Sequence, residues 1–218
     1  MKKTFLLLFA LSMVLPSCDK KSTDVTLPNK ALMMLAKEYY EGRMELFPWE
    51  ATTAGDNRYN DTYPNIVSDA YIAEVKAFFT KYKDGASEFK DEDLSENDRI
   101  TKELLLWECD SNLEQWSFNE QLLPINQFTS PILVIGQWGS GAGAQPFKTV
   151  KDYNNWLERL DDFNVYLNSV QGRMKEGVTK GYVLPKSLTE KMIPQLKDMA
   201  NEDVTSHLLF SPVKQFPD

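Results

Sequence analysis

Apolar side chains recur every three or four positions along five stretches of the chain, a spacing typical of amphipathic helices. The stretches cover residues 29–47, 68–83, 95–116, 149–177 and a segment that starts at 187. The fourth stretch is long and well patterned, with apolar residues along one face from Tyr153 to Met174. The pattern therefore predicts an all-α protein with about five amphipathic helices.

Residues that favour helix starts stand at the beginning of each stretch. The candidates are Asn29, Ser68, Ser95, Thr149 with Asp152, and Ser187 with Glu190. Their side-chain oxygens can accept hydrogen bonds from the free backbone N–H groups of a first turn, and the last two pairs have the spacing of a capping box. Helix ends are expected at Pro48, Gly85 and Gly177, and Pro194 is expected to kink the fifth helix.

The third stretch carries apolar residues on two adjacent faces. One face holds Ile100, Leu104, Trp107 and Ser111, and the other holds Leu105, Leu113 and Trp116. A helix that is apolar on more than one face is usually buried between neighbours. We therefore expect this helix to be covered on both faces.

Two long segments, residues 47–65 and 119–148, show no helical period and are rich in turn-forming residues. Both contain aromatic residues, which favours ordered loops packed on the body. Residues 132–135 could form a short strand, but one strand cannot make a sheet. The prediction is an irregular multi-helix array with two long ordered loops. Little follows the last helix to pack on it, so we also expect the array to be an incomplete part of a larger domain.

The N-terminus has the layout of a secretory signal peptide. Lys2 and Lys3 precede an apolar run over residues 5–15, which is too short to span a bilayer as a helix. Ser17 and Cys18 follow, and this ending resembles the lipobox of bacterial lipoproteins. The resemblance implies cleavage between Ser17 and Cys18 and attachment of lipid to Cys18. The alternative is an ordinary signal peptide with a chance cysteine.

The negative charge of the chain limits the classes of partner that it can bind. The formal net charge is −8, and it becomes more negative once Lys2 and Lys3 are removed. An acidic surface repels phosphate backbones and anionic lipid head groups, so we expect no nucleic-acid partner and membrane attachment through acyl chains alone. If Cys18 carries lipid, Cys109 has no disulfide partner and is expected to be a buried apolar thiol.

No complete catalytic or metal site is present in the sequence. The single histidine, His207, excludes a His-Glu-x-x-His zinc helix within the chain and is more typical of a surface or capping residue. Residues 56–61 loosely resemble a calcium loop but place Arg58 at a ligand position and lack the required glycine. The tryptophans could line a binding groove, but such residues more often pack in the core. Trp138, which lies in a glycine-rich stretch, is the best candidate for a tryptophan outside the core.

Several motifs in order carry a family resemblance. They are Phe47-Pro48-x-x-Ala51-Thr52-x-x-Gly55-Asp56-x-Arg58-Tyr59-Asn60-Asp61, the proline-rich approach over residues 124–137, Thr149-x-x-Asp152-Tyr153 with Leu157-x-x-Leu160, and Arg173-Met174-x-x-Gly177-x-x-x-Gly181-x-x-x-Pro185. Together they resemble the N-terminal part of domain-of-unknown-function family 885, a bacterial group often secreted or lipid-anchored.

That resemblance implies a helical fold related to zinc metallopeptidases of the carboxypeptidase-like kind. The zinc motif of the family, of the type His-Glu-x-x-x-Gly-His-His, lies in a C-terminal half, so its ligands carry over to no residue here. We therefore expect no cofactor in this chain, with zinc only in a full-length relative, and no catalytic residue. Asp56, Arg58 and Trp138 are the candidates for a substrate-cleft wall.

The sequence thus predicts three regions: a signal peptide at 1–17, a lipidated cysteine and tether at 18–28, and the N-terminal helical portion of the family domain at 29–218. The predicted function is that of a lipid-anchored bacterial cell-envelope protein, on the periplasmic side or the cell surface. It would be the truncated N-terminal part of a zinc-dependent peptidase-like protein, inactive alone, with a peptide substrate or the missing C-terminal half as partner. The alternatives are a non-catalytic peptide- or ligand-binding lipoprotein and an unrelated helical structural lipoprotein.

Overall fold

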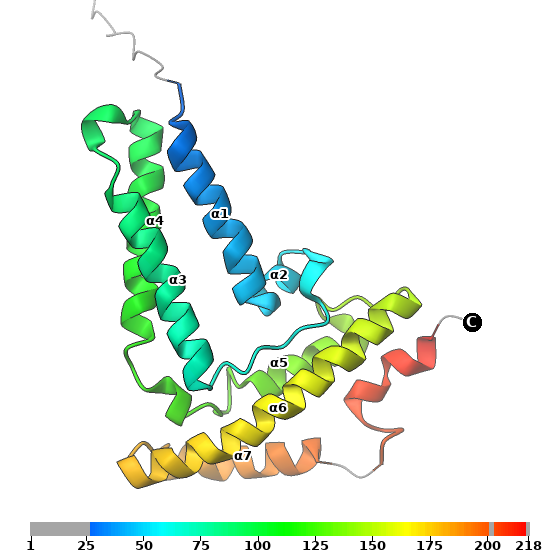
Figure 1. The fold of residues 1–218 in the computed structure, drawn as a ribbon. Coiled ribbons are helices and arrows are strands. Elements are labelled where there is room, and N and C mark those ends of the chain that lie inside the picture. The colour runs from blue at the N-terminus through cyan, green and yellow to red at the C-terminus, as the bar shows by residue number, and fades with distance from the viewer. Residues whose placement is uncertain (1–26, 201–202, 217–218) are drawn as a thin grey trace, which may run out of the picture.

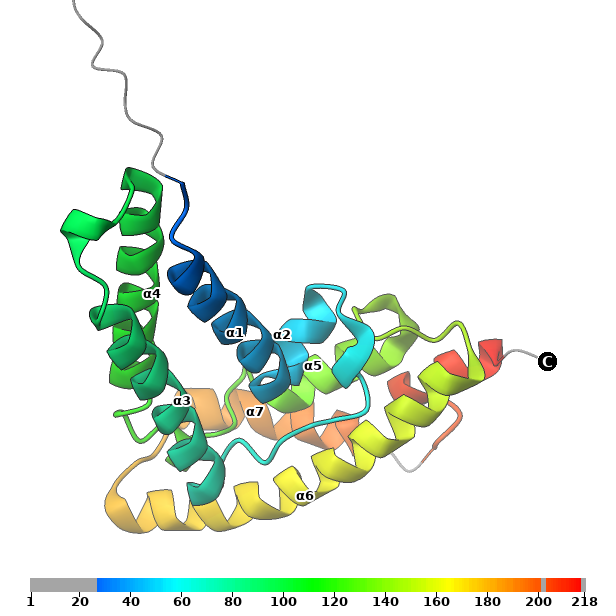
Figure 2. The same cartoon turned by 45° about the horizontal axis from the view of Figure 1, so that its top comes forward.

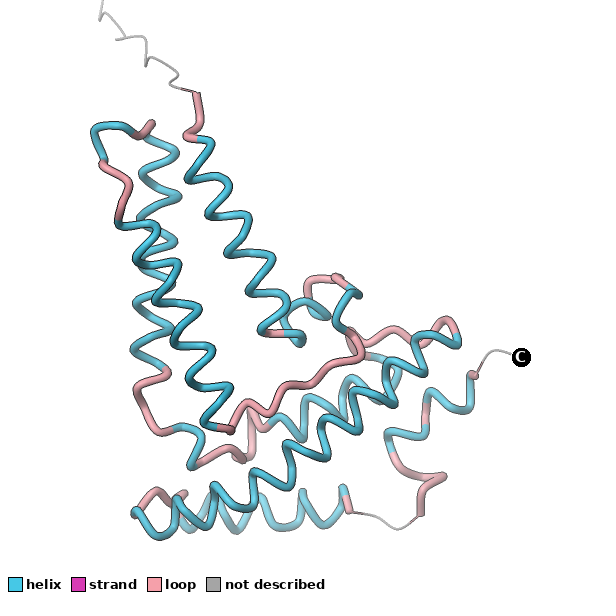
Figure 3. The backbone as a smooth tube through the Cα atoms, viewed as in Figure 1, coloured by secondary structure: helices cyan, strands magenta, loops and turns pink. Residues whose placement is uncertain are grey.

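The computed structural model describes residues 27–200 and 203–216, and these residues form helices and loops without a strand (Figure 3). The prediction of an all-α fold is confirmed. The signal peptide and the proposed lipid site at Ser17 and Cys18 lie outside the described residues. None of the helices in the described ranges is both long and apolar enough to cross a bilayer.

Seven α-helices build the described part of the chain (Figure 1). They are α1 (Lys30–Leu46), α2 (Pro48–Thr53), α3 (Asp69–Ser87), α4 (Glu96–Gln115), α5 (Pro131–Gln137), α6 (Val150–Lys180) and α7 (Lys186–Met199). Four short helical turns lie between them, namely η1 (Asn57–Tyr59), η2 (Asp91–Asp93), η3 (Glu120–Leu122) and η4 (Trp138–Ala142), and two more follow α7, namely η5 (Leu208–Phe210) and η6 (Pro212–Gln215).

Most of the predicted helix starts are confirmed. The side chains of Asn29, Ser68 and Ser95 accept hydrogen bonds from backbone N–H groups in the first turns of α1, α3 and α4. Thr149 and Asp152 form the complete capping box of α6. Each cap satisfies backbone donors that a helix start would otherwise leave without a partner.

The predicted start of the fifth helix is wrong by two residues, because a capping box would place the N-cap at Ser187 and the observed N-cap is Pro185. α7 begins at Lys186, and Pro185 occupies the N-cap position without a side-chain cap. The backbone N–H groups of Leu188 and Thr189 donate to the carbonyl of Pro185. The fixed φ of Pro185 suits the extended conformation of an N-cap residue, although proline offers no side-chain acceptor, and the predicted capping box of Ser187 and Glu190 does not mark the boundary. The helix assignment continues through Pro194.

Both segments predicted to be long loops contain a short helix that starts at a proline. α2 starts at Pro48 and α5 at Pro131, and α5 includes residues 132–135, for which a strand was the alternative. Proline ends a preceding helix but is also favoured at the first position of a new one, because its missing N–H is not needed there. The expectation of loops throughout residues 47–65 and 119–148 is therefore corrected.

Two predicted helix ends also differ. α3 passes through Gly85 to Ser87, and α6 passes through Gly177 to end at Gly181, whose φ of 82° is left-handed. Gly177 instead allows close approach, because a Cβ atom there would lie 2.5 Å from the carbonyl oxygen of Leu122. The glycine therefore permits contact between α6 and the η3 segment.

The apolar side chains gather in two cores, one in each arm of the molecule (Figures 1 and 2). The arm of α1, α3 and α4 buries aromatic residues such as Tyr39 and Phe79 together with the thiol of Cys109. The arm of α5, α6 and α7 buries a second set that includes Trp156 and Tyr166. Ring contacts through Trp49, which packs against both cores, link the two.

The prediction that α4 is covered on both faces is wrong. Leu105 and Cys109 are buried, but Ile100, Leu104 and Trp107 on the neighbouring face are 50%, 59% and 68% exposed. α3 and α1 contact the buried side of α4, and the described residues supply no neighbour for the other side. Trp107 is thus the exposed tryptophan, whereas Trp138 is only 7% exposed.

Candidate functional site

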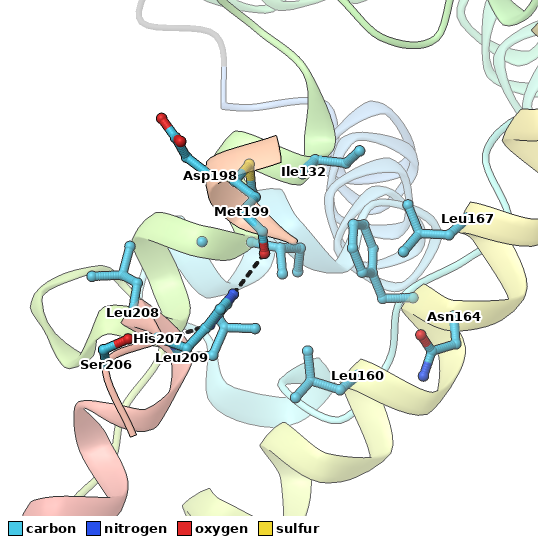
Figure 4. Close-up of a pocket in the computed structure, with 13 residues that line it drawn as sticks. Ile132, Leu160, Asn164, Leu167, Asp198, Met199, Ser206, His207, Leu208 and Leu209 are labelled. Atoms are coloured by element: carbon cyan, nitrogen blue, oxygen red, sulfur yellow. Dashed lines mark hydrogen bonds between the residues drawn. The ribbon is translucent and has the colours of Figure 1, made fainter. Parts of the chain in front are cut away.

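An apolar cavity of about 490 Å³ lies between α5, α6 and the C-terminal segment, by which we mean the end of α7 at Asp198 and Met199 together with residues 206–209. α5 contributes Ile132 and Ile135 to its wall, and α6 contributes Leu160, Phe163 and Leu167. Figure 4 shows α6 with Leu160 and Leu167 on one side and the C-terminal segment with Leu208 on the other. The cavity is therefore built from three parts of the chain that are distant in sequence.

Helical spacing explains how these side chains come together. Leu160, Phe163 and Leu167 follow one another at intervals of three and four residues, so they lie on one face of α6. Ile132 and Ile135 lie one turn apart on α5. The α6 residues were predicted to share a helix face, but the cavity could not be predicted, because α5, which opposes them, was expected to be a loop.

The polar groups of the cavity lie mainly at its rim. Asn164 and Asp198 are exposed, and His207 is half-buried. The backbone N–H of Leu209 donates to Nδ1 of His207 over 3.2 Å, and Nε2 of His207 lies 2.9 Å from the carbonyl oxygen of Met199. Because a carbonyl oxygen only accepts, Nε2 donates to Met199 and Nδ1 accepts from Leu209. His207 therefore caps η5, as the sequence suggested.

The residues present do not fit a zinc site. Zinc prefers imidazole, thiolate and carboxylate ligands in a cluster. Within the described residues no group of three or more such side chains gathers, and both nitrogens of His207 are engaged with backbone groups. Burial in a carboxylate-flanked site raises the pKa of the Cys109 thiol to about 11, so it is not poised as a ligand or nucleophile.

The three side chains predicted to wall a cleft occupy different environments. Arg58 pairs with Asp56 and with Glu41 at an exposed surface. The hydrogen bonds from Arg58 hold the pKa of the Asp56 carboxyl below its usual range. Trp138 is buried, with its ring 5.3 Å from the guanidinium of Arg159. None of the three lines the apolar cavity, and their role in a cleft stays a prediction.

Arg159 is a fully buried residue that the sequence analysis missed. Its guanidinium donates to the carbonyl oxygens of Tyr59 and Thr62, to Oε1 of Gln145 over 2.7 Å and to Oγ1 of Thr52 over 3.0 Å. Burial lowers the pKa of Arg159 to about 10, so it remains charged at neutral pH.

These contacts tie two segments to α6, one that contains Thr62 and one that contains Gln145. The signal for this role was available in the sequence, because Arg159 interrupts the apolar face that Trp156 and Phe163 define. A charged residue on such a face indicates a buried polar network.

The comparisons with known proteins give a family and nothing finer. Neither a curated protein nor a solved structure matches the chain. The sequence model of one family matches residues 48–218, which is most of the chain and includes the cavity and the Arg159 network. The chain therefore belongs to the family described as "Bacterial protein of unknown function (DUF885)".

Proposed function

We propose that this chain is the N-terminal helical portion of a zinc-dependent, peptidase-like lipoprotein of the bacterial cell envelope, and that its own part is to bind substrate. The apolar cavity between α5 and α6 holds an apolar side chain of a peptide. Hydrolysis requires ligands that this chain does not supply, so the chain by itself is inactive.

The observation that carries the proposal is the cavity. Its volume, about 490 Å³, falls within the range of roughly 300–1,000 Å³ that is usual for small-molecule sites. Its wall is aliphatic and aromatic, while Asn164 and Asp198 at the rim can hydrogen-bond polar groups of a ligand. Such a site favours a ligand with an apolar part inside and a polar part, such as a peptide backbone, at the mouth.

The zinc part of the proposal rests on family resemblance and not on this chain. A catalytic zinc needs three protein ligands and a water molecule whose pKa it lowers. Since the donor groups of residues 27–200 and 203–216 do not form such a set, no chemical step is assigned to any of these residues. The alternative is a non-catalytic binding lipoprotein, and it would use the same cavity.

The test compares two tryptophan variants of one helix. Leu160→Trp fills the cavity, whereas Leu157→Trp adds the same indole at a side chain that is 60% exposed on the same helix. Binding of neutral tripeptides with Phe, Leu or Ser at the centre is measured by calorimetry. We expect Phe and Leu peptides to bind better than the Ser peptide.

Leu160→Trp should weaken this binding at least about tenfold, or about 1.4 kcal/mol, while Leu157→Trp leaves it unchanged. Circular dichroism melts verify that both variants fold, and Leu167→Trp replaces Leu160→Trp if that variant does not. Equal binding of all three peptides, or equal effects of the two substitutions, would contradict the proposal. If the purified chain hydrolyses peptides and a chelator abolishes this activity, the proposal that the chain alone is inactive is contradicted.

A further inference from the structure

The exposed face of α4 carries a regular apolar stripe. Ile100, Leu104 and Trp107 are each at least half exposed, and Ser111 continues their spacing of four, three and four residues. We call these four residues the α4 seam. Residues at this spacing form a continuous line along one side of a helix, which is the pattern by which one helix packs on another.

Acidic side chains line one edge of the seam. Glu96 and Glu103 precede Ile100 and Trp107 by four residues, and Glu114 follows Ser111 by three. All three glutamates are exposed, and none forms an ion pair with another described residue. Arg99 is exposed on the same helix but lies farther round it. The edge thus presents negative charge beside an apolar surface.

We propose that the α4 seam is a docking surface for an amphipathic helix of a second polypeptide, one that carries Lys or Arg along one edge of its own apolar stripe. The seam supplies a central tryptophan, a residue type enriched among those that dominate binding energy. The acidic edge supplies charge complementarity to the basic residues of the partner helix. This inference is independent of the cavity and of the proposed function.

The same charges disfavour two other occupants. A second copy packed antiparallel through α4 would place the acidic edge of one copy against that of the other, and like charges at an interface are unfavourable. An anionic lipid surface would also be repelled by Glu96, Glu103 and Glu114. A basic helix satisfies both the apolar and the charged parts of this face.

The probe is a synthetic helical peptide of about 20 residues, a length at which helices become stable in water. It has leucines at the spacing of the seam and lysines along one edge; a second peptide has glutamates in place of the lysines. Fluorescence anisotropy measures the binding of each labelled peptide to the purified protein at low and high salt. We expect the lysine peptide to bind, the glutamate peptide to bind at least about tenfold more weakly, and salt to reduce this difference.

Two substitutions separate the seam from general surface effects. Trp107→Lys should weaken binding of the lysine peptide at least about tenfold. Val165→Lys, at a side chain 57% exposed on α6, should leave this binding unchanged. Glu103→Lys should weaken binding of the lysine peptide and strengthen binding of the glutamate peptide. Because these side chains are exposed, the variants should melt as the wild type does.

Several results would overturn the proposal. They are equal binding of the two peptides, an equal effect of Trp107→Lys and Val165→Lys, or no binding of the lysine peptide. If analytical sedimentation shows that the wild type is a dimer and that Trp107→Lys is a monomer, the α4 seam binds a second copy of the chain instead. If the wild type binds phosphatidylglycerol vesicles and Trp107→Lys does not, the α4 seam binds the membrane instead.

Discussion

The buried guanidinium of Arg159 gives the most direct prediction about stability. Arg159→Met keeps an unbranched apolar stem, shorter than arginine, and removes the charge and every hydrogen-bond donor. The guanidinium now binds Thr52, Tyr59, Thr62 and Gln145 and lies over the ring of Trp138. The substitution therefore tests whether this network holds residues 57–62 and the loop at residues 143–149 on α6.

The magnitude follows from the acceptors that lose their donor. The Tyr59 carbonyl still accepts from the N–H of Thr62, and the Thr52 hydroxyl still contacts Pro48 and Asn60. The carbonyl of Thr62 and Oε1 of Gln145 lose the only donors that the described residues give them. An unpaired acceptor that is buried, such as Oε1 of Gln145, costs about 1–3 kcal/mol, and the space left by the shorter methionine adds to this cost, while release of a desolvated charge offsets part of it. We expect the free energy of unfolding to fall by about 2–4 kcal/mol.

Urea unfolding followed by circular dichroism measures this change, and an unchanged m-value verifies that the transition remains comparable. Arg58→Met is the matched control. Its ion pairs with Asp56 and Glu41 are exposed and screened by solvent, so its midpoint should stay near that of the wild type. Hydrogen exchange of residues 57–62 should accelerate in Arg159→Met alone. If Arg159→Met shifts the midpoint no more than Arg58→Met, the network does not hold these loops.

Three further predictions concern a thiol, a carboxyl and the proposed anchor. Burial raises the pKa of Cys109 to about 11, so a disulfide reagent at about pH 8 should modify it only as the protein unfolds; immediate modification of the native protein would contradict its burial. Hydrogen bonds from Ser95 and from the backbone of Asn29 lower the pKa of Asp98 in the folded state. Because the unfolded pKa is higher, about 3.9, this stabilisation is present above that value and is lost as pH falls through the folded pKa. Asp98→Asn should therefore show a smaller loss of melting temperature than the wild type between about pH 6 and pH 3, and parallel curves would disprove the coupling. Cys18→Ala should release the protein from membranes in a fractionation experiment, and unchanged membrane association would count against lipidation.

The sequence predicted those parts of the fold that depend on local chemistry. Asn29, Ser68, Ser95 and Thr149 cap helices as expected, because a cap is decided within about one turn of backbone. Pro48 was expected only to end the first helix, although it also starts α2.

The candidate site depended on contacts between distant segments and could not be predicted in the same way. The cavity needs α5 to lie opposite Leu160 and Leu167, and no local pattern specifies that placement. Arg159 finds its partners about 100 residues away in the chain, at Tyr59 and Thr62. The exposed α4 seam has the same periodicity as a buried face, so periodicity alone predicted burial there.

The central claim is that the cavity between α5, α6 and the C-terminal segment binds an apolar group. A methyl-labelled sample titrated with the Phe tripeptide tests it directly by nuclear magnetic resonance. The account predicts that the methyl signals of Ile132, Leu160 and Leu167 shift together as the peptide saturates, while those of Leu105 in the other core stay in place. Shifts confined to residues outside the cavity, or no shift at saturating peptide, would contradict it.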